Sequence, residues 1–143
     1  MGVGVPQRSL SDLVIDASAA VDAAVSSYGF QLYAGHHMHG PGLLWWEFNS
    51  VIHERTYLGE VPAAAAAEAM DRFHRASIRE AASTPDFLAA SVEVARRLGW
   101  AKVYDAAYVA LALALPGSRL VTRDERLRRG ASRLVEIISP ADL

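Results

Sequence analysis

The sequence predicts an α/β fold in which helices cover both faces of a parallel sheet. Short β-prone runs alternate with longer helical patterns, the order expected when crossover helices join parallel strands. The 143 residues suit one domain with a sizeable core, and 52% are hydrophobic, which argues against disorder. Because no repeat or linker divides the chain, we expect a single domain over residues 1–143, with a flexible lead at 1–11.

The first elements follow from local signals. Residues 13–15 (Leu-Val-Ile) form a β-prone run. We expect a helix directly after it, with Ser18 as its N-cap and Gly29 at its C-terminal end. Residues 36–42 contain three histidines, two glycines and a proline, a composition that predicts a loop.

The middle of the chain is predicted to be mainly helical. One long helix is expected from about Leu43 to Leu58, with Gly59 as its stop. A second helix is expected from about Pro62 to Ala76, because proline suits the first turn and alanine favours helix. A weak strand is predicted between residues 77 and 82.

The last third completes the alternation. It is predicted to contain a helix over 85–98, a second helix from Asp105 to before Pro116, a strand at Leu120-Val121, a short helix over 122–129 and a strand over 134–138. The second helix is apolar nearly all round and should be buried. The first should bury one stripe, made of Leu88, Val92, Ala95 and Leu98.

Composition excludes several classes of protein. The chain has no cysteine, which rules out a disulfide framework, a thiolate zinc site and a cysteine nucleophile. Residues 1–11 lack the apolar region of a signal peptide, and the longest apolar run, residues 106–115, is too short to span a bilayer. We therefore expect a soluble cytoplasmic protein with no membrane partner.

The positions of the charged residues along the chain are more informative than the net charge. The net charge of −2 gives no general basic field. Arg123 and Arg126, the candidate RNA contacts, belong to a cluster that is either a solvated helix face or a phosphate-contacting patch. The whole cluster is Arg119, Arg123, Arg126, Arg128, Arg129 and Arg133.

Four carboxylates, Asp16, Glu47, Asp105 and Asp124, form one candidate site. Singly each has an ordinary explanation as a strand end, a surface residue, a charge near a helix N-terminus, or a first-turn acid in a capping box of Thr122 with Glu125. The placement of all four acids together favours a shared site. Asp16 and Asp124 follow strands, whose carboxyl ends line the ligand crevice of a parallel sheet, and Asp105 begins a buried helix.

Helical geometry places Glu47 at the edge of its helix's apolar stripe, so its carboxylate needs a partner. Two carboxylates about 5 Å apart repel by roughly 3 kcal/mol at an effective dielectric constant of 20. A hard divalent cation, Mg²⁺ or Mn²⁺, would relieve that repulsion and suits phosphoester hydrolysis. Ser18 and Thr122 are candidates to orient ligands or water, and Asn49 to hydrogen-bond a neighbouring acid.

Four segments of the chain resemble the PIN domain, of the kind found in VapC toxins of bacterial toxin–antitoxin pairs. They occur in the order and at the separations typical of that family. They are Leu13-Val14-Ile15-Asp16-Ala17-Ser18, Glu47-Phe48-Asn49, Val103 to Ala112 with its Tyr104-Asp105 pair, and Leu120-Val121-Thr122-Arg123-Asp124-Glu125-Arg126-Leu127.

The resemblance implies a three-layer α/β/α fold with a five-stranded, mostly parallel sheet. It implies RNA cleavage dependent on Mg²⁺ or Mn²⁺, with the four acids as ligands and Ser18, Asn49 and Thr122 nearby. It also implies a homodimer and a cognate antitoxin bound beside residues 43–76. The chain departs from the family pattern at Leu113, where many relatives carry an acid, in its histidine-rich segment, and at Trp45-Trp46.

Our first hypothesis is therefore a metal-dependent endoribonuclease toxin in which metal-activated water attacks an RNA phosphodiester. The alternatives are a catalytically silent PIN-fold interaction module, and a metal-dependent nuclease or phosphatase with a substrate other than RNA. A transition-metal site at His36, His37 and His39 is a minor alternative. We expect Trp45 in the core and Trp46 exposed on a partner surface; His53 and His74 are expected at the surface.

Overall fold

The computed structural model describes residues 11–143 of the chain. The expected flexible lead therefore lies outside the described residues, apart from Ser11. The carbonyl oxygen of Ser11 accepts a hydrogen bond of 3.0 Å from the backbone nitrogen of His37. Ser11 is thus tied to the start of the neighbouring strand.

Five parallel strands form the central sheet of the described residues. They are β1 (Asp12–Ile15), β2 (His37–Pro41), β3 (Ile78–Ala81), β4 (Arg119–Val121) and β5 (Ile137–Ile138). Their order is β3-β2-β1-β4-β5, and every neighbouring pair is parallel. The chain thus builds outward from β1 to β3 on one side, then returns to add β4 and β5 on the other.

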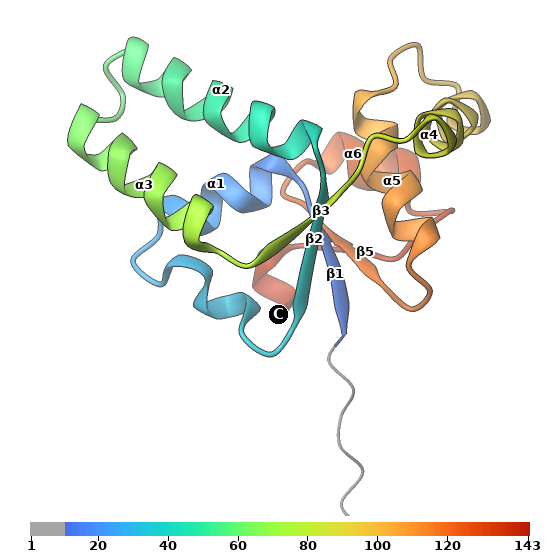
Figure 1. Ribbon diagram of the computed structural model, residues 1–143, viewed down its shortest axis with the longest axis horizontal. Coiled ribbons are helices and arrows are strands. Elements are labelled where there is room, and N and C mark those ends of the chain that lie inside the picture. Colours follow the sequence, from blue (N-terminus) through green and yellow to red (C-terminus); the bar gives the residue numbers. More distant parts are fainter. Residues whose placement is uncertain (1–10) are drawn as a thin grey trace, which may run out of the picture.

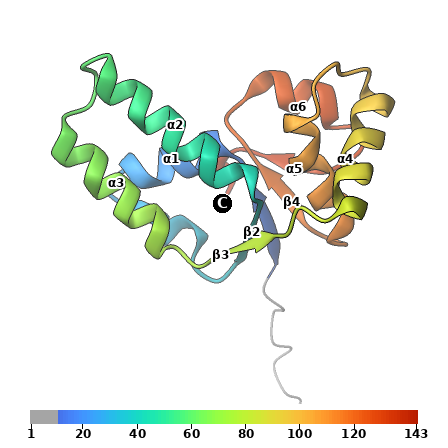
Figure 2. The same ribbon diagram turned by 45° about the horizontal axis from the view of Figure 1, so that its top comes forward.

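Helices cover both faces of this sheet. One layer contains α1 (Ala17–Val25), α2 (Leu43–Tyr57) and α3 (Ala63–Arg75); the other contains α4 (Pro85–Leu98), α5 (Tyr104–Ala114) and α6 (Glu125–Ala131) (Figure 1). Figure 2 shows the same two layers after rotation. Two short 3₁₀ helices, η1 (Gly29–Tyr33) and η2 (Pro140–Asp142), complete the described elements. The expected three-layer α/β/α fold is confirmed.

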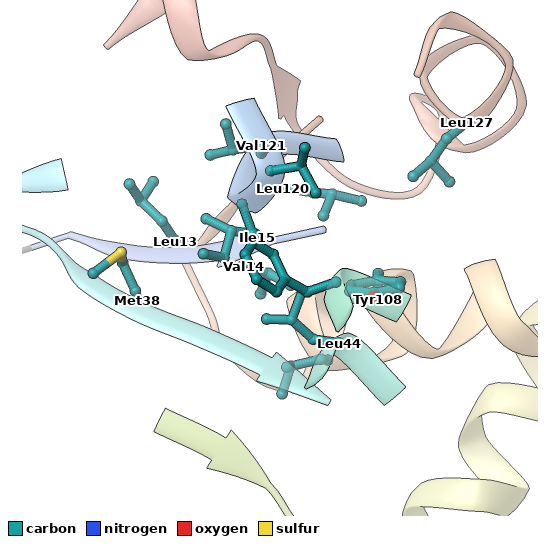
Figure 3. Close-up of a cluster of buried hydrophobic side chains, with 14 of the residues drawn as sticks. Leu13, Val14, Ile15, Met38, Leu44, Tyr108, Leu120, Val121 and Leu127 are labelled. Carbon is teal, nitrogen blue, oxygen red and sulfur yellow. The ribbon is translucent and has the colours of Figure 1, made fainter. Parts of the chain in front are cut away.

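The core lies around the two central strands. The side chains of β1 residues 13–15 and of Leu120 and Val121 in β4 are fully buried, because helices cover β1 on both faces (Figure 3). Burial of each such side chain stabilises the fold by about 1.5–3 kcal/mol. Between α2 and α3, the rings of Phe48 and Phe73 stack with centroids 3.9 Å apart. The strand that ends beside Asp16 and the helix that carries Glu47 are therefore packed directly against this core.

Strand β2 corrects the prediction of a loop at residues 36–42. Glycine and proline are strong local breakers, but pairing with β1 on one side and β3 on the other forms a strand here. A Cβ atom on Gly40 would overlap Cδ2 of the buried Leu44, so a larger residue here would require that side chain to move. Pro41 stands at the last position of the strand, beyond the three residues of β2 that pair with β1.

The first helix also differs from its prediction. Its N-cap is Asp16 rather than Ser18, because the Asp16 carboxylate accepts a 2.9 Å hydrogen bond from the backbone nitrogen of Ala19. The helix ends at Val25, and Gly29, with φ of 57°, begins η1 instead of ending α1. The polar side chain that ends β1 therefore also begins α1.

Helix α4 buries a different stripe from the one predicted. Leu88 and Val92 are exposed, whereas Ser91 and Val94 are buried together with the predicted Ala95. The hydroxyl of Ser91 is satisfied by the Phe87 carbonyl oxygen at 2.9 Å, so a polar residue can occupy the buried face. Within residues 11–143, no helix has the length and apolar character needed to cross a bilayer.

Candidate active site

The site lies where the strand order reverses. Strands β1 and β4 are neighbours in the sheet, with Ile15 beside Val121, yet they are far apart in sequence. The residues that follow them, Asp16 and Thr122, therefore meet, and the Asp16 backbone nitrogen donates to the Val121 carbonyl oxygen at 3.2 Å. In open parallel sheets, ligands bind outside the carboxyl ends of the strands at this switch point.

Asp16 is held by a nearly complete set of hydrogen bonds. Its Oδ1 accepts from Ser18 Oγ at 2.7 Å and from the Ala19 nitrogen at 2.9 Å, and its Oδ2 accepts from Thr122 Oγ1. A carboxylate can accept about four hydrogen bonds, so one position stays open on Oδ2. Burial raises the pKa of Asp16, the three hydrogen bonds oppose that shift, and the charge of Asp124 adds to it.

The loop between β4 and α6 is bonded to the start of α1. Thr122 Oγ1 accepts a hydrogen bond of 2.9 Å from the Asp124 nitrogen, and Ser18 Oγ accepts one of 2.9 Å from the Arg123 nitrogen. Thr122 and Ser18 thus link two segments more than 100 residues apart. Their predicted place beside the acids matches the structure, and their role is to orient Asp16 and this loop.

Asp124 is the N-cap of α6. Its Oδ1 accepts from the backbone nitrogens of Arg126 at 2.9 Å and Leu127 at 3.3 Å. The capping box of Thr122 with Glu125, the ordinary explanation weighed for this acid, is not formed, because Thr122 is part of the Asp16 network. Capping leaves Asp124 half-buried and close enough for its charge to act on Asp16 and Asp105.

Glu47 has a partner that sequence reasoning missed. The buried Tyr108 on α5 donates its hydroxyl to Glu47 Oε1 at 2.6 Å, and this bond joins the two helical layers. Burial raises the pKa of Glu47, the Tyr108 bond opposes the shift, and the charges of Asp105 and Asp16 add to it. Two signals were available: Tyr108 shares a helix face with Asp105, and a buried tyrosine hydroxyl needs a partner.

Asp105 completes the set of four. The residue is largely exposed at the start of α5, yet partial burial of its carboxyl group raises its pKa. The charge of Asp124 raises it further, whereas the nearby Arg126 guanidinium lowers it. The structure therefore brings all four predicted acids into one electrostatically coupled set around the ends of β1 and β4.

The candidate ligands in this set are all carboxylate or hydroxyl oxygens, which is the type of ligand that hard divalent cations prefer. Within residues 11–143, however, no three histidine, aspartate or glutamate side chains are arranged to hold one ion as they stand. Mg²⁺ is commonly bound by one or two carboxylates, with water and substrate phosphate as the other ligands. The open position on Asp16 Oδ2 and the charges of the neighbouring acids are features that such a cation requires.

Other predicted residues lie in different surroundings. The side-chain amide of Asn49 donates to the Trp45 carbonyl oxygen of its own helix at 2.8 Å, rather than to an acid. Trp45 packs against the core and Trp46 is 80% exposed, both as expected. His53 and His74 are at the surface, as expected.

The histidine-rich segment lies at the amino ends of the strands, away from the acids. His39 Nε2 lies 2.9 Å from Asp12 Oδ1, and His36 Nδ1 lies 2.5 Å from Ser11 Oγ. These pairings give His36 and His39 ordinary hydrogen-bonding roles, with Ser11 just before β1 and Asp12 at its start. In the described part of the chain they form no metal-binding group.

The arginine cluster is divided rather than gathered into one patch. Arg126 lies close enough to Asp105 for its charge to lower the pKa of that carboxyl group. Three others interact with other parts of the chain. Arg123 pairs with Asp22, Arg128 lies 3.7 Å from Asp142, and Arg133 donates to the Arg97 carbonyl oxygen at 2.7 Å.

Comparison with known proteins gives a consistent result. The PIN domain family matches residues 13–132. The crystal structure of PAE2754 from Pyrobaculum aerophilum is similar, with 24% sequence identity, a TM-score of 0.73 and 93% of each chain covered, which shows the shared fold. No curated protein matches the chain. PIN domains are typically nucleases that use divalent metal ions. The sheet order, the acids at its carboxyl edge and the family match agree: the chain belongs to the PIN domain family.

Proposed function

We propose that this protein is a Mg²⁺- or Mn²⁺-dependent endoribonuclease. The observation that carries the proposal is the set of four acids around β1 and β4, three of which have pKa values raised by burial and by one another's charges. A protein gains nothing in stability from such repulsion, so a cationic ligand is the best account of it.

Each residue then has a defined task. Asp16 and Asp105 are the central candidates to hold the cation, and Asp124 and Glu47 complete the set. When bound, the cation supplies Lewis-acid chemistry: it neutralises phosphate charge and lowers the pKa of water. Ser18 and Thr122 fix the orientation of Asp16, and Tyr108 fixes that of Glu47. Arg126 provides a positive charge for the RNA backbone.

Cleavage of single-stranded RNA during a Mn²⁺ titration tests this proposal. We expect metal-dependent cleavage by the wild type and a loss of more than about 100-fold in Asp16→Asn, because loss of a ligand exceeds the effect of losing an outer partner. Asp71→Asn, on the exposed surface of α3, is the matched control and should cleave normally. Metal-independent cleavage, or full activity in Asp16→Asn, would refute the mechanism.

Two controls separate the alternative functions. Single-stranded DNA and a generic phosphoester, tested as competitors, distinguish an RNA-directed enzyme from another nuclease or a phosphatase. The melting temperature with millimolar Mg²⁺ tests the silent interaction module, since a ligand that binds only the folded state must raise it. An unchanged melting temperature, together with absent cleavage, favours the module.

We further propose that the enzyme is a toxin restrained by an antitoxin bound beside α2 and α3. The support is the exposed apolar surface of α2, where Trp46 and Tyr57 are 80% and 82% exposed. If a small reading frame lies beside the gene, its product should bind the protein, abolish RNA cleavage and fail to bind Trp46→Ser. Cleavage unaffected by that product would contradict the toxin role.

We also propose a homodimer. The exposed Leu88 and Val92 lie one turn apart on α4, outside the stripe that the domain buries, and a second copy is a suitable partner for such a surface. Sedimentation should show a dimer for the wild type and for Ala90→Glu on the same helix, but a monomer for Leu88→Glu. A wild-type monomer would refute this proposal.

A further inference from the structure

A cavity of about 480 Å³ opens beside the acids but is not lined by them. It lies among α1, η1, the β4–α6 loop and η2. Its lining includes Asp22, Leu32, Arg123, Glu125, Pro140 and Ala141. Its size is within the range of sites for small organic ligands, and none of the functions assigned above uses it.

The cavity and the acid site share the β4–α6 loop. Arg123 lines the cavity with its side chain, while its backbone nitrogen donates to Ser18 Oγ, which itself donates to Asp16. Glu125 follows directly after Asp124. The cavity and the acid site are therefore connected through the backbone of this loop.

The charges of the lining argue against a phosphate in the cavity. Its one cationic side chain, Arg123, forms an ion pair with Asp22 on α1. The second carboxylate, Glu125, has no ion-pair or hydrogen-bond partner among residues 11–143. The lining thus carries a net negative charge, which repels anions and favours a neutral ligand that donates hydrogen bonds.

The shape and chemistry of the walls suit a planar base. Leu32, Pro140 and Ala141 supply apolar walls, whereas Asp22 and Glu125 supply acceptors. Sequence-specific RNA recognition commonly holds an unstacked base in a pocket and reads its Watson–Crick edge. Guanine presents two adjacent donors on that edge, N1–H and the N2 amino group, whereas each other base presents a single donor group.

We propose that this cavity binds an unpaired guanine next to the scissile phosphate, with the Asp22 and Glu125 carboxylates accepting hydrogen bonds from its Watson–Crick edge. The proposal rests on the proposed ribonuclease function and adds a sequence preference to it. A bidentate contact of this kind corresponds to a preference of roughly 10-fold or more over the other bases.

Nucleoside binding without divalent ions tests the cavity independently of catalysis. Guanosine, cytidine, uridine and inorganic phosphate are titrated separately into ¹⁵N-labelled protein while the backbone amide signals are followed. We expect saturable shifts at Arg123 and Glu125 with guanosine, weaker shifts with the pyrimidine nucleosides and none with phosphate. Equal shifts with phosphate, or no shift with guanosine, would overturn the proposal.

Two matched tryptophan variants then connect the cavity with RNA cleavage. Ala141→Trp fills the cavity from an exposed position, and Ala67→Trp places the same bulk on the exposed surface of α3. Ala141→Trp should abolish the guanosine shifts, raise the KM for RNA and remove the preference for guanine at the cleavage site; Ala67→Trp should behave as the wild type. A guanine preference that survives in Ala141→Trp contradicts the proposal.

The two sets of results distinguish the two proposals. If guanosine binds but RNA is not hydrolysed with Mg²⁺ or Mn²⁺, the ribonuclease function fails while the cavity assignment stands. If RNA is hydrolysed without a base preference and guanosine does not bind, only the cavity assignment fails.

Discussion

Replacing Tyr108 with phenylalanine removes one hydroxyl group and leaves the buried ring in place. The lost interaction is the 2.6 Å hydrogen bond to Glu47 Oε1, which connects α5 to α2 across the sheet edge. A hydrogen bond to a charged group contributes about 1.5–3 kcal/mol to stability. Because Glu47 is only half-buried, water can replace part of the lost hydrogen bond. We therefore expect a loss of stability at the lower end of that range, about 1.5 kcal/mol.

This free energy corresponds to a measurable change in melting temperature. Unfolding entropy of about 2.1 cal/mol/K per residue, over 143 residues, gives about 0.3 kcal/mol/K for the whole chain. A loss of about 1.5 kcal/mol should therefore lower the melting temperature by about 5 °C. Thermal denaturation followed by circular dichroism at pH 7.5, without divalent ions, measures the change.

Tyr104→Phe is the matched control, because Tyr104 lies on the same helix and is 62% exposed. It should change the melting temperature by less than about 1 °C, as surface substitutions typically do. The Tyr108→Phe penalty should shrink as pH falls through the raised pKa of Glu47, because protonation removes the charge that strengthens the bond. Equal melting temperatures for the two variants at pH 7.5 would refute the reasoning.

Three further predictions concern the network, the charges and the corrected strand. Thr122→Val removes the donor to Asp16 and the acceptor for the Asp124 nitrogen, so urea denaturation should show a loss of about 1–3 kcal/mol; an unchanged midpoint contradicts the network. Burial and mutual charge raise the pKa values of Asp16, Glu47 and Asp105 above the ordinary values of 3.8 and 4.5. In the pH window between the ordinary and the raised pKa values, the folded state therefore binds more protons than the unfolded chain. Stability without divalent ions should therefore fall as pH rises through that window, and millimolar Mg²⁺ should reverse the loss; calorimetry showing a rise would disprove this. Gly40→Ala should cost about 1–3 kcal/mol through overlap with Leu44, measured by thermal denaturation, and a neutral result would argue against the close approach of β2 to α2.

The parts of the fold that were predictable depend on local chemistry. Helix α3 begins and ends within one residue of its prediction, because the alanine run and the proline before it act within a few residues. Helix α5 was predicted to be buried because it is apolar nearly all round, and its middle, Ala106 and residues 108–112, is buried. The approach of Asp16 to Asp124 was also predictable, since parallel strands bring their carboxyl ends to one edge.

The parts that were missed depend on partners distant in sequence. Residues 36–42 contain local breakers, and only the presence of β1 and β3 on both sides makes β2 a strand. Tyr108 and Glu47 are 61 residues apart, and Arg123 and Asp22 are 101 apart, so the sequence around each residue does not identify its partner. The stripe buried by α4 was likewise set by its packing against α5 rather than by its own composition.

The sequence by itself therefore determined the fold class, most of the helices and the identity of the acids, because these follow from periodicity, capping and spacing along the chain. Tertiary structure decided how each acid is held, which arginine stays beside them and where the neighbouring cavity opens. Those features arise because β1 pairs with β4 and because α2 and α5, from opposite helical layers, come into contact through Glu47 and Tyr108. The physical reason is that hydrogen bonds, burial and charge coupling act over a few ångströms, whatever the separation in sequence.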